Sequence, residues 1–152
     1  MRTTLFLFLT CGLLVAADYR PGPDAQRRDG VPRGKVILGA WNDCKAFPGT
    51  TRSYWVYIPA QYDPKRPANL MVFQDGGGFV RENGHTRVPT VFDNLIHRKE
   101  LPVTIGLFVN PGSVPGAEPG NQPRRNRAFE YDTVSADNAN FIIDELWPVV
   151  AK

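Results

Sequence analysis

Three consecutive glycines are the part of this 152-residue chain best suited to chemistry. Gly76, Gly77 and Gly78 follow the apolar run 70–73, which is typical of a strand buried in the middle of a parallel sheet. Such strands end at the sheet edge where α/β enzymes place their sites, and glycine lets backbone N–H groups approach a ligand closely. No GxxxxGK(S/T) or GxGxxG pattern is present, so we reject a nucleotide-binding loop. The glycines therefore form either a tight structural turn or an oxyanion hole.

An oxyanion hole needs a nucleophile, and the chain does not offer a convincing one. Beyond residue 17 the serines are Ser53, Ser113 and Ser135, none of them in a GxSxG elbow. Of the two histidines, His97 is predicted to lie on a helix surface, whereas His85 follows the glycines and could line a site. No pair of histidines or cysteines has metal-ligand spacing. The residues present cannot build a complete catalytic triad.

Strands and helices that could position the glycines are visible in the hydrophobic pattern. Predicted strands cover 35–41, 51–58, 69–75 and 103–109, and predicted helices cover 88–97 and 132–147, the second ending near Pro148. Loops are expected at 76–87 and 110–125. The third and fourth strands, joined by a helix, form a βαβ unit and should be parallel, whereas the first two form an antiparallel lead-in. The expected class is α/β with a mixed sheet, in an incomplete sandwich.

The first 34 residues are not expected to belong to the core. Residues 1–17 have a positive start, a short apolar run and small residues near Ala17, which predicts a secretory signal peptide and export to the periplasm or outside the cell. The run is too short for a membrane anchor, so no stable anchor is expected after cleavage. Residues 18–34 are rich in proline and glycine and read as a linker or arm. The domain proper is expected over 35–152.

Charge and cysteine content exclude some classes of partner. The chain carries 18 basic and 15 acidic residues, a net charge of +3, which is too small and too dispersed to favour nucleic acid. Cys44 is the only cysteine beyond the predicted signal peptide, so no internal disulfide can form there. We expect neither a nucleic-acid partner nor a metal site.

Four motifs in order across the chain resemble the amino-terminal half of the enterochelin esterase-like, or esterase D-type, branch of the α/β-hydrolases. The first, Arg52–Pro59 with Tyr62, resembles the strand R-x-Y-W-V-Y-x-P-x-x-Y. The run Leu70–Gly76 is similar to the family's strand and Asp-Gly corner, and Pro102–Asn110 to its strand ending in Asn or Asp. The last motif, R-x-x-E-Y followed by F-x-x-E-L-x-P, begins at Arg127.

The resemblance implies an α/β-hydrolase fold and a serine carboxylic ester hydrolase that needs no metal or organic cofactor. It implies a small-molecule ester as substrate; relatives act on siderophore, feruloyl, acetyl-sugar, formyl-thiol or mycolyl esters. It places backbone N–H donors of the oxyanion hole at Gly77 and Gly76, and it makes Glu130 and Tyr131 structural. The candidate substrate contacts around these donors are Asp75, Gly78, Phe79 and His85.

The chain departs from this family in two ways. Many relatives carry a larger residue where Gly77 stands, and the nucleophile elbow, the acid and the histidine are missing. We therefore expect a fragment that needs a carboxyl-terminal half to complete its fold and that is inactive alone. Two alternatives stay open: a secreted carbohydrate- or peptide-binding module that uses Trp41, Trp55 and Tyr57, or a nonfunctional gene remnant. Burial of these three aromatic residues would favour the esterase half.

Overall fold

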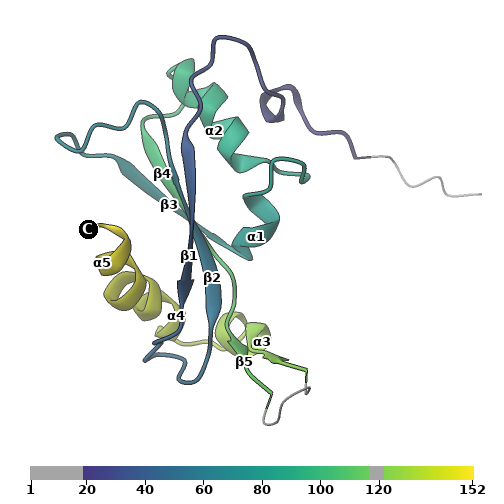
Figure 1. Ribbon diagram of the computed structural model, residues 1–152, viewed down its shortest axis with the longest axis vertical. Coiled ribbons are helices and arrows are strands. Elements are labelled where there is room, and N and C mark those ends of the chain that lie inside the picture. The colour runs from purple at the N-terminus through teal and green to yellow at the C-terminus, as the bar shows by residue number, and fades with distance from the viewer. Residues whose placement is uncertain (1–18, 117–121) are drawn as a thin grey trace, which may run out of the picture.

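The computed structural model describes residues 19–116 and 122–152, so the predicted signal peptide lies outside the described residues. Its centre is a four-stranded sheet in the order β1-β2-β4-β3 (Figure 1). The strands are β1 (Lys35–Trp41), β2 (Arg52–Ile58), β3 (Asn69–Gln74) and β4 (Thr104–Val109). All four predicted strands are confirmed, with bounds within one residue of those expected.

The pairing of the strands agrees with the βαβ prediction. β1 runs antiparallel to β2, and β2 runs antiparallel to β4. β3 and β4 are parallel over six residue pairs, from Asn69 opposite Thr104 to Gln74 opposite Val109. The helix that crosses between them is α2 (Val88–His97), which has the predicted bounds. The fold class is therefore α/β with a mixed sheet, as predicted.

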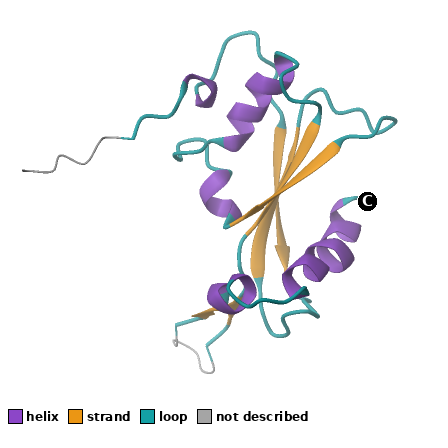
Figure 2. Cartoon of the chain, turned by 180° about the vertical axis from the view of Figure 1, so that it is seen from behind, coloured by secondary structure: helices purple, strands orange, loops and turns teal. Residues whose placement is uncertain are grey.

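The helices lie on both faces of the sheet (Figures 1 and 2). One face carries α2 and the short α1 (Gly76–Phe79). The other carries a continuous helical segment made of α4 (Asp137–Asn140), the π-helical η2 (Phe141–Leu146) and α5 (Trp147–Val150). Within the described residues, no helix is long and apolar enough to cross a membrane.

The predicted start of the second helix was wrong, whereas its end lies near Pro148 as expected. The second helix does not start at Asp132; the shorter α3 (Arg127–Tyr131) comes first and a turn separates it from α4. The helix continues past Pro148 to Val150. Proline normally disrupts a helix because it lacks an N–H and its ring clashes with the carbonyl four residues earlier. The wider π-helical turn of η2 shifts that hydrogen-bonding pattern just before Pro148, so the helix can continue.

The two expected loops also contain regular structure. α1 occupies the start of the loop predicted over 76–87. In the loop predicted over 110–125, β5 (Ser113–Val114) pairs with β6 (Arg124–Arg125), and Thr51 forms an isolated bridge to Ser113. This ribbon ties the region after β4 to the start of β2.

β3 was predicted to be a buried central strand, and that was wrong. It lies at an edge of the sheet, and Leu70, Met71 and Val72 are 36–41% exposed. Its apolar sequence suits a strand with neighbours on both sides. Among the described residues, however, only β4 pairs with it.

Residues 19–34 lie along the outer side of α2. They contain a 3-10 turn, η1 (Pro23–Ala25), whose Ala25 is buried. The buried Asn94 of α2 donates hydrogen bonds from Nδ2 to the carbonyls of Asp24 and Gln26, at 2.7 and 2.9 Å. The carboxylate of Asp93, also on α2, accepts from the N–H of Gly34 at 2.7 Å. We call residues 19–34 the strap, because these bonds fasten them to α2.

Candidate functional site

The glycines and the end of β4 meet at one edge of the sheet. Because β3 and β4 are parallel, the residues that follow Gln74 and Val109 emerge side by side. Asp75 and the glycines of α1 therefore lie beside Asn110. This edge holds the backbone N–H groups that the sequence singles out.

Gly76 is required by a close approach of two backbones. A Cβ at this position would lie 2.4 Å from both the carbonyl carbon of Phe108 and the nitrogen of Val109. Only glycine avoids that clash, since real Cβ atoms do not approach so closely. Gly76 is buried, and its carbonyl accepts the N–H of Val80 at 3.0 Å. The corner is consequently a short helical turn packed on β4 and not a loose loop.

The N–H of Gly77 already has a hydrogen-bond partner. It donates to Oδ1 of Asn110 at 2.9 Å. A Cβ at Gly77 would lie 3.1 Å from that oxygen and 3.2 Å from the ring of Trp55. Glycine therefore lets Asn110 and Trp55 lie close to the first turn of α1. From the sequence, Asn110 was recognised only as the end of a strand, because nothing local reveals this bond.

The other predicted substrate contacts are not all gathered at the corner. Gly78 is exposed and donates its N–H to the carbonyl of Asp75 at 2.9 Å. Phe79 is half-buried against Phe73, with ring centroids 5.6 Å apart. The exposed His85 packs against Tyr19 of the strap: their ring centroids are 5.2 Å apart, and the Tyr19 hydroxyl donates to the His85 carbonyl at 3.2 Å. His85, which was predicted to contact a substrate, therefore contacts the strap instead.

Asp75 combines an uncommon backbone conformation with a side-chain partner distant in sequence. Its φ is 54°, in the left-handed region that few residues adopt, although aspartate and asparagine do so more often than most. Nε of Arg127 donates to both carboxylate oxygens at 3.0 Å, and a second guanidinium nitrogen lies 2.6 Å from Oδ2. These bonds raise the pKa of Arg127 above its usual value. The Arg127–Asp75 pair connects α3 to the glycine corner.

Tyr131, on the same helix, lies beneath this pair. Its hydroxyl accepts the N–H of Asp75 at 3.5 Å, and the guanidinium of Arg127 lies 5.2 Å from the centroid of its ring. Burial raises the pKa of Tyr131 to about 12, so the phenol is neutral under ordinary conditions. Its contacts are those of a support for the corner.

α3 is anchored by a buried ion pair. Arg52 at the start of β2 and Glu130 are 2.7 Å apart, and their side chains are 1% and 0% exposed. Glu130 also accepts from Asn126 Nδ2 at 2.9 Å and from the N–H of Gly112 at 3.1 Å. The guanidinium of Arg52 stacks 4.2 Å from the centroid of Phe141. This network joins β2, α3 and η2, which agrees with a structural role for Glu130.

A small polar cavity opens next to Asn110. It measures about 380 Å³, and polar side chains supply most of its lining: Asn42, Thr51, Arg52, Ser53, Asn110 and Ser113. Within the described residues, no three His, Cys, Asp or Glu side chains are grouped to hold a metal ion. Among the described residues, the corner offers backbone and amide donors, and neither Ser53 nor Ser113 beside the cavity lies in a nucleophile elbow.

Comparison with known proteins supports this view of the fold. No family model matches the chain. Over 92 residues it is 28% identical to endo-1,4-beta-xylanase Y of Acetivibrio thermocellus, in a match that covers 57% of this chain and 8% of that protein. It is similar to the structure of a CE1 ferulic acid esterase from Anaeromyces mucronatus in complex with ferulic acid. That match has a TM-score of 0.58 and 15% identity, and it covers 86% of this chain and 47% of the esterase.

The same esterase in the absence of substrate gives a TM-score of 0.58 at 16% identity. The fold is part of an α/β-hydrolase sandwich. The chain spans less than half the length of the esterase that it matches. The narrower resemblance to the enterochelin esterase-like branch stays a prediction.

Proposed function

We propose that this chain is the front half of an exported serine carboxylic ester hydrolase of the enterochelin esterase-like type. The observation that carries the proposal is the position of Gly76 and Gly77, in a tight turn at the carboxyl edge of β3 and β4. In such an enzyme, the N–H of Gly77 stabilises the negative oxygen of the tetrahedral intermediate. One donor of this kind contributes about 3–4 kcal/mol to transition-state stabilisation.

Asn110 marks the position of that oxygen. Its Oδ1 accepts the Gly77 N–H at 2.9 Å, within the range for a donor that faces an oxyanion. The ester oxygen would replace Oδ1 when the substrate binds. Asn110 would then stay within reach of the adjacent polar cavity.

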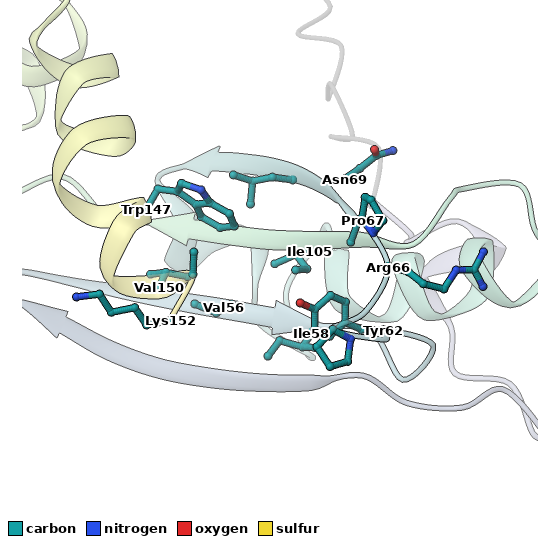
Figure 3. Close-up of a pocket in the computed structure, with 14 residues that line it drawn as sticks. Val56, Ile58, Tyr62, Arg66, Pro67, Asn69, Ile105, Trp147, Val150 and Lys152 are labelled. Carbon is teal, nitrogen blue, oxygen red and sulfur yellow. The ribbon is translucent and has the colours of Figure 1, made fainter.

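The exposed edge of β3 is where we place the rest of the enzyme. An additional parallel strand on β3, reached from α5 by a right-handed crossover, would cover Leu70, Met71 and Val72. A cavity of about 590 Å³ lies beside this edge, between α5 and the amino ends of β3 and β4 (Figure 3). Its lining includes Val56, Ile58, Ile105, Trp147 and Val150. Such apolar walls suit a segment of the missing half, which would also carry the serine, acid and histidine.

The proposed substrate is a small ester of an aromatic acid. The support is the likeness in fold to an esterase named for ferulic acid. Export rests on the predicted signal peptide over 1–17. The proposed chemistry uses side chains and backbone N–H groups and calls for no cofactor.

Three experiments test the proposal. The purified chain should not hydrolyse p-nitrophenyl acetate or methyl ferulate above the buffer rate, and turnover at the rate of a complete esterase would contradict it. The reading frame after codon 152 should encode a GxSxG motif.

When the two parts are expressed together, Gly77→Pro removes the N–H and should lower kcat by about 100- to 1,000-fold. Gly78→Ala, at a site with open space, is the matched control.

The aromatic residues count against the binding-module alternative. Tyr57 is fully buried, and its hydroxyl donates to Asp93 at 2.7 Å. Trp41 and Trp55 are half-buried and pack against different cores on opposite faces of the sheet. The three side chains do not form one accessible patch. The remnant alternative predicts little amide protection in 69–75 and 103–109, which hydrogen exchange can measure.

A further inference from the structure

β1 is an unprotected edge strand, and it lies at the opposite edge of the sheet from β3. Within the described residues it pairs with β2 alone, in an unbroken register from Lys35–Ile58 to Trp41–Arg52. Val36, Ile37 and Leu38 are 42%, 43% and 65% exposed. Monomeric proteins usually protect such an edge with charges, proline or a bulge. β1 has a single charged residue, at its first position.

The proposed completion of the enzyme cannot cover this edge. A strand added to β3 would be separated from β1 by three strands, β3, β4 and β2. α2 and the strap also leave Leu38 exposed, although its side chain points to their face of the sheet with Trp55 and Tyr57. The exposed apolar surface of β1 therefore needs an occupant of its own.

We propose that β1 pairs with β1 of a second copy of this chain, antiparallel around a two-fold axis at Leu38. The sequence of the strand is complementary to itself in this register. Bulky residues of one copy face small residues of the other: Val36 lies opposite Ala40, and Ile37 opposite Gly39. A centre one residue later would instead place Ile37 opposite Trp41. The resulting sheet is continuous over both copies.

Charges at the two ends of the strand favour the same register. A two-fold axis at Leu38 places Arg33 of one copy opposite Asp43 of the second copy. Because of the symmetry, the dimer contains this pair twice. Both side chains are exposed, and among the described residues neither forms a salt bridge within the chain. Lys35 lies opposite Trp41, where an ammonium can stack on the indole ring. Opposite charges directly across a pair of strands stabilise it.

The ring of Tyr54 completes the contact on the α4–α5 face. A Cβ on Gly39 would lie 2.2 Å from Cζ of Tyr54, so this ring lies directly over the glycine. In the dimer, Ile37 of the second copy would pack beside that ring. Glycine at position 39 leaves room for both.

Sedimentation of the full chain tests the dimer. The contact of two seven-residue strands is small, so we expect a dissociation constant on the order of 10–100 µM. Leu38→Lys brings two ammonium groups together and should leave the chain monomeric at about 200 µM, twice the upper end of the expected range of constants. The matched control is Leu70→Lys on β3, which should still dimerise. A wild-type chain that stays monomeric at ~1 mM overturns the proposal, as does loss of the dimer only with Leu70→Lys.

A charge swap tests the register. Arg33→Glu should weaken the dimer about tenfold, and adding Asp43→Arg should restore it, because the pair is then reversed. Failure of the double variant to recover would overturn the register. In a chain with Cys11→Ser, Leu38→Cys should form a disulfide-linked dimer under mild oxidation, since directly opposed strand residues lie within bonding range. Leu70→Cys is the control, and cross-linking of that variant alone would contradict the proposal.

Discussion

The two faces of the sheet are covered to different extents. On the α2 face, Tyr57, Phe92 and Phe108 form one buried aromatic cluster, and the strap fastens a further layer over α2. On the opposite face, Phe141 and Leu146 are fully buried in the core, but a cavity of about 590 Å³ lies beside α5. The first face is covered along its length, by α2 and by a strap whose bonds join residues 59 to 70 positions apart in sequence. The second depends on a long-range polar network at one end and is open at the other.

The largest effect should come from breaking the network that closes the α4–α5 face. Glu130→Gln leaves the buried guanidinium of Arg52 without a counter-charge, which typically costs 3–5 kcal/mol. We expect the free energy of unfolding, measured with urea, to fall by about that amount. The double variant Arg52→Met with Glu130→Gln should recover most of the loss, since no unpaired charge remains and the amide oxygen can still accept from Asn126 and Gly112. A loss below ~1 kcal/mol in Glu130→Gln would show that the network does not hold this face.

The strap is the corresponding target on the α2 face. Asn94→Ala removes two hydrogen bonds to strap carbonyls from a side chain that is 1% exposed. The expected cost is about 2 kcal/mol, with faster amide exchange confined to residues 22–28. His97→Ala, at the exposed end of α2, is the control and should change little. If exchange rises equally across β1 and β4, the strap is not a separate layer.

Sequence patterns predicted the parts of this molecule that depend on neighbours along the chain. The apolar stripe of 88–97 defined α2, and the alternation in 51–58 defined β2. The prediction failed for β3, because its apolar sequence cannot show that, among the described residues, β4 alone pairs with it. It also missed the pairs Asp75–Arg127 and Gly77–Asn110, which join residues 52 and 33 positions apart. Only the fold brings such partners together.

Alkaline pH should destabilise the fold through two buried tyrosines, Tyr57 on the α2 face and Tyr131 at the corner. Burial, and then the hydrogen bond to Asp93, raise the pKa of Tyr57 above its usual value near 10; burial raises the pKa of Tyr131 to about 12. A raised folded-state pKa gives stability that is complete below pH 10 and is lost as the pH rises further. Each tyrosine contributes a slope of about 1.4 kcal/mol per pH unit between pH 10 and 12.

Tyr57→Phe should therefore remove half of the slope that the two tyrosines supply. It should also lower stability at neutral pH by about 1 kcal/mol, since Asp93 loses one donor. Urea unfolding at pH 7, 10 and 11.5 measures both effects. An unchanged alkaline slope would mean that Tyr57 is not shielded from ionisation by the α2 face.

The smallest global effect is expected from Arg127→Gln, at the exposed end of the polar network. The side chains of Arg127 and Asp75 are 52% and 43% exposed, so water screens their attraction and the urea midpoint should not move measurably. The local effect should be larger, because Asp75 then holds its left-handed conformation without a bidentate partner. Amide exchange at Gly76, Gly77 and Gly78 should quicken, while exchange in α2 stays constant. If Arg127→Lys behaves like Arg127→Gln, it is the planar two-point contact, and not the charge, that holds the corner.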